Sequence, residues 1–197
     1  MAYTGKRKNR FSYLNEYAAG VDGSYIYTGA YYVLEGGAKK RKNVNITLII
    51  SCVLFAALFI LAGCTNVGGD FMAGKFFWNT WFIIIPYALL AVGIFLFIWR
   101  AVKLLLEKEP VKKYVYEKSV PWLGPVSMFI FIFALADIAV SFVYLGVVGS
   151  YTSLAALILY MAINLFMAAL AFVFNKFFKK NTWTESPVKP DVAVDVE

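Results

Sequence analysis

Four long stretches with almost no charge dominate this sequence. They cover residues 44–64, 77–99, 121–148 and 151–175, and Asp137 is the only charged residue inside them. A helix needs about 20 apolar residues to cross a hydrocarbon core about 30 Å thick. Helices satisfy their own backbone hydrogen bonds in lipid, and the stretches lack the alternating pattern of barrel strands. The sequence therefore predicts an all-α membrane protein with four transmembrane helices.

The lysine and arginine residues indicate how these helices are oriented. Eighteen of the 19 basic residues lie before residue 44, between the second and third stretches, or after residue 175. The two other loops contain a single basic residue, Lys75. Loops rich in lysine and arginine remain in the cytoplasm. We therefore expect a multi-pass protein of the cell membrane with both termini cytoplasmic.

The chain divides into three parts. Residues 1–43 form a cytoplasmic N-terminal segment, residues 44–176 the four-helix transmembrane domain, and residues 177–197 a cytoplasmic tail. The polar, proline-containing composition of residues 184–190 predicts that this tail is disordered. The turn at residues 149–150 is so short that the third and fourth helices are expected to form a tight antiparallel hairpin.

The end of the first stretch resembles the cleavage and lipidation site of bacterial lipoproteins. In Leu61-Ala62-Gly63-Cys64, small residues precede a cysteine. A secretory signal usually has about 15–30 residues with an apolar core of about 7–15. Here 43 residues precede a stretch that is long enough to span the membrane. We expect an uncleaved first helix, whereas cleavage would leave three spans and a lipidated Cys64.

The residue inventory argues against catalysis. Histidine is absent, which removes the commonest general base and the commonest metal ligand. No metal-binding, nucleotide-binding or paired-acid motif is present. We therefore expect a protein that is not an enzyme and that binds neither a cofactor nor a metal.

The net charge of +7 points to lipid as a partner, with no nucleic acid. The basic residues flank the apolar stretches, where such residues contact anionic headgroups. The expected headgroup contacts are Lys39, Lys40, Arg41, Lys42, Lys176, Lys179 and Lys180.

The charge inside the third stretch has a predicted partner in the fourth. Asp137 lies twelve residues before Gly149 and Asn164 lies fifteen after it. At 1.5 Å per residue, their depths in the membrane differ by about 4–5 Å. Ser141 and Tyr160 lie one turn from these two residues and share their helix faces. We predict a buried cluster of these four residues, in which a protonated Asp137 donates a hydrogen bond to Asn164.

Two roles for this cluster remain open. Polar contacts between transmembrane helices contribute on average about 0.6 kcal/mol and help to specify packing. Acidic residues within the membrane also mark proton and ion pathways. Asp137 has no basic partner at its depth and no second carboxylate nearby in the sequence, so we favour the packing role.

Tyrosines gather in two segments on the predicted cytoplasmic side. Residues 24–33 and 113–117 are rich in residues that favour strands, and we expect them to pack together as a small Tyr-rich cap. Exposed tyrosines are typical of docking surfaces, although tyrosines also anchor proteins at the headgroup level. The candidate docking surface consists of Tyr25, Tyr27, Tyr31, Tyr32, Tyr114 and Tyr116.

Two functions are compatible with this sequence. Ala155, Ala162 and Ala169 recur every seven residues, and such a seam of small residues lets another helix approach closely. We expect a non-catalytic accessory, scaffold or partner-binding subunit, which meets a membrane or cytoplasmic protein. The alternative is a small transporter or channel that forms a homo-oligomer and uses Asp137 as a proton- or cation-responsive site.

Overall fold

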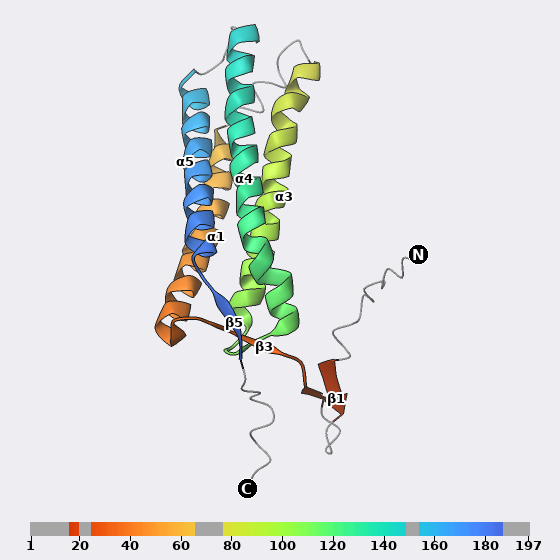
Figure 1. Ribbon diagram of the computed structural model, residues 1–197. Helices are drawn as coiled ribbons and strands as arrows, with labels where there is room; N and C mark the ends of the chain where they lie inside the picture. Colours follow the sequence, from red (N-terminus) through yellow and green to blue (C-terminus); the bar gives the residue numbers. More distant parts are fainter. Residues whose placement is uncertain (1–15, 20–24, 66–76, 149–153, 187–197) are drawn as a thin grey trace, which may run out of the picture.

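Four long helices form the body of the protein. The computed structural model describes residues 16–19, 25–65, 77–148 and 154–186. Its helices are α1 (Gly37–Cys64), α3 (Phe77–Leu106), α4 (Lys113–Val148) and α5 (Leu154–Lys179) (Figure 1). Each contains a segment long and apolar enough to cross a membrane, which confirms the four predicted helices. The turn predicted at residues 149–150 lies outside the described residues, as do residues 1–15 and 187–197.

Large apolar side chains cover much of the outside of this bundle. Ile50 and Val53 on α1, Phe95 on α3 and Val173 on α5 are each more than half exposed. Soluble monomers rarely expose apolar patches on this scale. The outer faces therefore suit contact with lipid, as expected for a multi-pass membrane protein.

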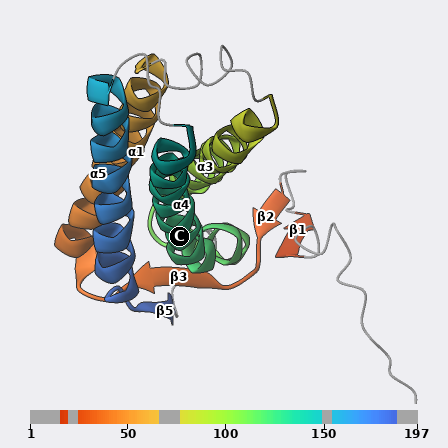
Figure 2. The same cartoon turned by 90° about the horizontal axis from the view of Figure 1, so that it is seen from above.

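Helix α4 lies between α3 and α5 and makes its main contacts with these two helices, while α1 contacts α3 and α5 (Figure 2). Gly93 marks a close approach of α3 to α4. A Cβ atom at this position would lie 2.8 Å from Phe129 and 3.1 Å from Ile130, both on α4. Glycine is therefore required for the observed spacing.

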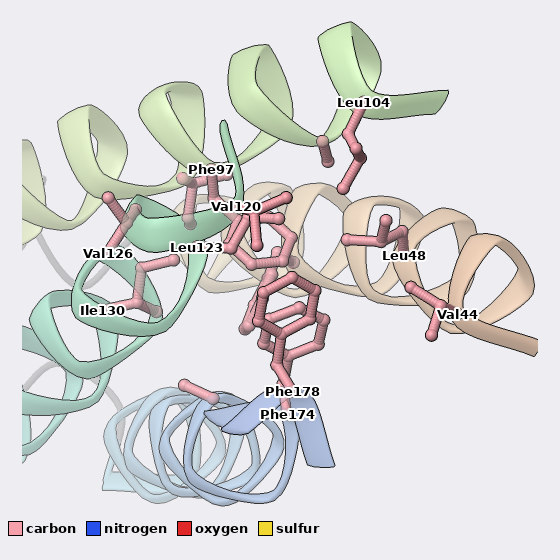
Figure 3. Close-up of a cluster of buried hydrophobic side chains, with 14 of the residues drawn as sticks. Val44, Leu48, Phe97, Leu104, Val120, Leu123, Val126, Ile130, Phe174 and Phe178 are labelled. Atoms are coloured by element: carbon pink, nitrogen blue, oxygen red, sulfur yellow. The ribbon is translucent and has the colours of Figure 1, made fainter. Parts of the chain in front are cut away.

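Aromatic rings fill the centre of the bundle. The Phe97 ring of α3 is fully buried, and its centroid lies 5.1 Å from that of Phe55 on α1 and 4.8 Å from that of Phe174 on α5. Figure 3 shows Phe97, Phe174 and Phe178 converging with aliphatic side chains from α1, α3 and α4. Edge-to-face ring contacts of this kind contribute packing energy beyond the area that they bury.

The described residues form five short strands, which lie beyond one end of the bundle; we call this end the sheet end (Figure 1). Strands β1 (Tyr17–Ala19) and β2 (Tyr25–Tyr27) form an antiparallel pair. Strand β3 (Tyr31–Leu34) pairs antiparallel with both β4 (Val111–Lys112) and β5 (Trp183–Ser186). This three-stranded sheet joins the segment before α1, the α3–α4 connection and the segment after α5.

The structure corrects two expectations about these segments. The tail was predicted to be disordered from residue 177, but α5 continues to Lys179 and residues 183–186 form β5. The strand-favouring residues 113–117 begin α4, and the strand that pairs with β3 lies just before them at residues 111–112. Strands β4 and β5 both pair with β3, which is distant from them in the sequence. The tendency of a segment to form a strand depends on such partners.

The turn between β3 and α1 depends on glycine. Gly36 has φ 107° and Gly37 has φ 68°, a backbone region that side chains with a Cβ rarely adopt. These two residues let the chain leave the sheet and enter the bundle without strain.

Candidate functional site

The four polar residues of the predicted cluster are all buried inside the bundle. Asp137, Ser141 and Asn164 are 0 % exposed, and Tyr160 is 4 % exposed. The first two lie one turn apart on α4, and the last two lie one turn apart on α5. The helix contacts between α4 and α5 thus enclose polar side chains from both.

Two of these side chains donate hydrogen bonds to their own helix. Ser141 Oγ donates to the backbone oxygen of Asp137 at 2.7 Å, and Asn164 Nδ2 donates to the backbone oxygen of Tyr160 at 3.1 Å. Bonds to the carbonyl one turn earlier satisfy a donor without linking two helices. Neither side chain donates to the carboxyl group of Asp137.

The Asp137 carboxyl group has no hydrogen bond of standard geometry to any described residue. Both of its oxygens and Asn164 Oδ1 are buried, and none of the three forms such a hydrogen bond with a described residue. The Tyr160 hydroxyl lies beside the Asp137 carboxyl group and the Asn164 amide. It interacts with both, but neither contact has the distance and angles of a regular hydrogen bond. The hydrogen bond predicted from Asp137 to Asn164 is therefore absent, because neither Asp137 oxygen bonds to Asn164 Oδ1.

Tyr87 of α3 extends this cluster to α1 and α3. The residue was not among those predicted from the sequence. Its ring centroid lies 6.4 Å from that of Tyr160, and its hydroxyl donates to the Phe59 backbone oxygen of α1 at 2.9 Å. A Cβ atom at Gly63 would lie 2.8 Å from the Tyr87 hydroxyl oxygen, so glycine leaves room for this contact. The signal available in the sequence was a hydroxyl within an apolar span, which needs a partner because lipid supplies none.

The tyrosines of the proposed docking surface differ widely in exposure. Tyr25 is 78 % exposed, whereas Tyr27 and Tyr31 are 1 % and 2 % exposed. Tyr27 and Tyr31 were expected at a docking surface, and this expectation is corrected because their rings pack against each other with centroids 5.1 Å apart.

The three remaining tyrosines of that set are partly buried, and two of them stack on each other. Tyr32 on β3 stacks on Tyr116 of α4 with centroids 4.1 Å apart and planes 7° apart. The Tyr114 ring lies 6.2 Å from that of Tyr27. The tyrosines thus fasten the β-strands to the start of α4, and Tyr25 is the member of the set that remains fully open.

Tyr27 also holds polar groups together beside the sheet. Its hydroxyl donates to Glu16 Oε2 at 2.8 Å and accepts from the Lys113 backbone nitrogen at 3.2 Å. Burial raises the pKa of the Tyr27 hydroxyl above its ordinary value, and Glu16 raises it further. The hydroxyl is therefore protonated at neutral pH, as its role of donor requires. Lys113 Nζ lies 3.8 Å from Glu16 Oε1, which ties the segment before β1 to α4.

Arg41 was expected to contact lipid headgroups, and the structure corrects this expectation. Its guanidinium donates to the backbone oxygen of Leu104 at 2.8 Å and lies 3.9 Å from Glu109 Oε1. The same group lies 5.1 Å from the centroid of the Trp183 ring on β5. These partners bury Arg41 (5 % exposed), so the residue joins α1 to α3, to the α3–α4 connection and to β5.

The other basic residues of that set remain at the surface of the sheet end. Lys39, Lys42, Lys176, Lys179 and Lys180 are exposed, and Lys40 is half-buried. Long lysine side chains at the ends of spans reach toward headgroups while their stems cover apolar surface.

No group of three or more metal-ligating side chains occurs among the described residues. Cys52 and Cys64 are free thiols. Comparisons with protein-family models, with curated proteins and with solved structures find no match to this chain.

Proposed function

We propose that this chain is a non-catalytic subunit of the cell membrane that binds a helix of another membrane protein. The observation that carries the proposal is the position of Ala155, Ala162 and Ala169, which are all exposed on the outer face of α5. Small residues let two helix backbones approach closely, and van der Waals packing drives helix association in lipid. An alanine seam that faces away from its own bundle is therefore free for another helix.

The inner face of the same helix supports this reading. Leu157, Asn164, Met167 and Ala171 are buried against the rest of the bundle. The packing of α5 within this chain thus uses a different set of residues from the alanine seam. Larger apolar side chains such as Leu159 flank the seam and are exposed, so a partner helix would find small side chains at the centre and larger ones beside them.

We further propose that the sheet end lies in the cytoplasm. Most basic residues of the sequence lie in the segments that meet there, and such segments remain in the cytoplasm. Because the strands join three of these segments into one sheet, the sheet would present a single folded surface to cytoplasmic partners, with Tyr25 exposed on the adjoining strand pair.

A second candidate function is a small transporter or channel that assembles from several copies. The observation in its favour is Asp137, a fully buried acid whose carboxyl oxygens have no partner of standard geometry among the described residues. Acidic residues at such depth mark proton and ion pathways. Four helices enclose little space, so a pathway beside Asp137 would need copies of the chain to assemble.

Cross-linking from the alanine seam tests the proposal and separates the two candidates. A Cys52→Ala, Cys64→Ser chain would carry Ala162→Cys, and a matched control would carry Phe95→Cys on the exposed face of α3. Both would be treated in native membranes with an oxidant and with a thiol-reactive photo-cross-linker. We expect Ala162→Cys to form a discrete adduct with one other membrane protein, identified by mass spectrometry, and Phe95→Cys to form none.

The further outcomes are equally specific. Adding Ala169→Ile to the Ala162→Cys chain should remove the adduct, because a larger side chain on the seam prevents close approach of the partner helix. A disulfide-linked dimer of the chain itself would favour the transporter candidate over the accessory subunit. If Ala162→Cys gives no more product than Phe95→Cys, the seam binds no helix and the proposal is wrong.

A further inference from the structure

A shallow pocket lies at the sheet end, between α1 and the connection that follows α3. Its volume is about 390 Å³, and we call it the α1–α3 pocket. Its polar lining consists of Arg41, Lys42, Asn45, Glu107, Lys108 and Glu109. None of these residues belongs to the alanine seam or to the Asp137 cluster, so the pocket is independent of the function proposed above.

The pocket crosses the boundary between apolar and charged surface. Ile46 and Ile49 also line it, and both are exposed on the outer face of α1. Lys42 lies one turn before Ile46 and is exposed as well. An abrupt change from exposed isoleucine to exposed lysine along one helix marks the level where acyl chains end and headgroups begin.

The charges in the pocket include both signs. Arg41 is engaged by Glu109, by the Leu104 carbonyl and by the Trp183 ring. Lys42, Lys108 and Glu107 form no salt bridge with any described residue, although the charge of Glu107 also acts on Arg41. Two ammonium groups and one carboxylate thus remain on the walls, and a ligand that complements them carries a negative group next to a positive one.

Two buried atoms at this site also have no partner of their own. Arg41 Nη1, a donor, and Asn45 Oδ1, an acceptor, are buried without a hydrogen bond to any described residue. A buried polar group without a partner costs free energy. A ligand with both an acceptor and a donor is able to satisfy the pair.

We propose that the α1–α3 pocket binds the phosphoethanolamine headgroup of a phospholipid. Lys42 and Lys108 bind the phosphate, and Glu107 accepts hydrogen bonds from the primary ammonium group. A choline headgroup has no N–H to donate to Glu107. A purely anionic headgroup leaves Glu107 and Glu109 facing a charge of the same sign. The acyl chains of the bound lipid lie along Ile46 and Ile49.

The test uses the full-length protein in detergent with defined lipids and counts bound lipids by native mass spectrometry. Phosphatidylethanolamine, phosphatidylcholine and phosphatidylglycerol with identical acyl chains would be offered at equal concentration. We expect phosphatidylethanolamine to be retained about tenfold more than phosphatidylcholine, because a charge-assisted hydrogen bond contributes about this difference in affinity. Inorganic phosphate at the same concentration should not displace it, since it lacks the ammonium group and the acyl chains.

Three variants assign the roles, with Lys103→Gln as the control at an exposed site outside the pocket. Glu107→Gln should abolish the preference for ethanolamine over choline while phospholipid binding persists. Lys42→Gln and Lys108→Gln should each weaken the retention of all phospholipids, and Lys103→Gln should change nothing. Equal retention of ethanolamine and choline lipids by the unaltered chain would overturn the proposal. A preference for phosphatidylglycerol that is unaffected by Glu107→Gln would overturn it as well, because a basic surface alone explains that result.

Discussion

Replacing Arg41 by glutamine should lower the free energy of unfolding by about 2 kcal/mol, because the buried Leu104 carbonyl loses a charged donor, whereas Glu109 is exposed. The guanidinium contacts Leu104, Glu109 and Trp183, which belong to three different segments of the chain. Glutamine is shorter and uncharged, so Glu109 loses its cation and the Leu104 carbonyl loses its donor.

The measurement is thermal unfolding of the purified protein in detergent, with Lys39→Gln as a matched control two residues away. Lys39 is exposed, so its substitution should change stability by less than about 0.5 kcal/mol. Arg41→Lys should fall between the two, because lysine keeps the charge but lacks the planar fork that stacks on an aromatic ring. If Arg41→Gln unfolds at the same temperature as Lys39→Gln, the contacts of Arg41 do not join these segments.

Replacing Phe97 by alanine should cost about 3 kcal/mol and loosen the middle of the bundle. The ring is 0 % exposed and contacts the rings of Phe55 and Phe174, so its removal leaves a cavity between α1, α3 and α5. Lipid is as apolar as this core, so the loss comes from packing contacts and the cavity, with little from transfer to the solvent.

Phe95→Ala provides the matched control, because Phe95 is two residues away on the same helix and 66 % exposed. This substitution should be nearly neutral, because the lipid fills the space that the ring leaves. Denaturant unfolding of both variants in the same detergent measures the difference. Similar losses for the two variants would contradict the inward orientation of Phe97 and the outward orientation of Phe95.

The sequence predicted the four helices because each apolar stretch carries its own signal. It placed their ends less well: α1 begins at Gly37, α3 ends at Leu106 and α4 begins at Lys113, each beyond the predicted span. The extra turns carry charged residues at the sheet end, and hydropathy does not distinguish a charged helical turn from a charged loop. Strand β5 was missed for a related reason, since its partner β3 lies far away in the sequence.

Some residues of the candidate sites could likewise be predicted from the sequence, and others could not. Helix rise alone suggested that Asp137 and Asn164 lie at similar depth, and the structure places both inside the bundle. Tyr87 was missed as their neighbour, because a hydroxyl within an apolar span indicates that a partner is needed but not which helix supplies it. The burial of Arg41, Tyr27 and Tyr31 was missed because their partners come from distant segments, whereas a run of basic or aromatic residues looks exposed on its own.

We propose that four helices cross the membrane and that the sheet end is cytoplasmic. The most direct test is labelling of intact cells with a membrane-impermeant maleimide. In a Cys52→Ala chain, Cys64 is the remaining thiol and lies at the end of α1 opposite the sheet. In a chain that lacks both native cysteines, Lys180→Cys places a thiol at the sheet end. We predict that Cys64 is labelled in intact cells and that Lys180→Cys is labelled only after the membrane is permeabilised. Labelling of Lys180→Cys in intact cells, with Cys64 protected until permeabilisation, would contradict this orientation.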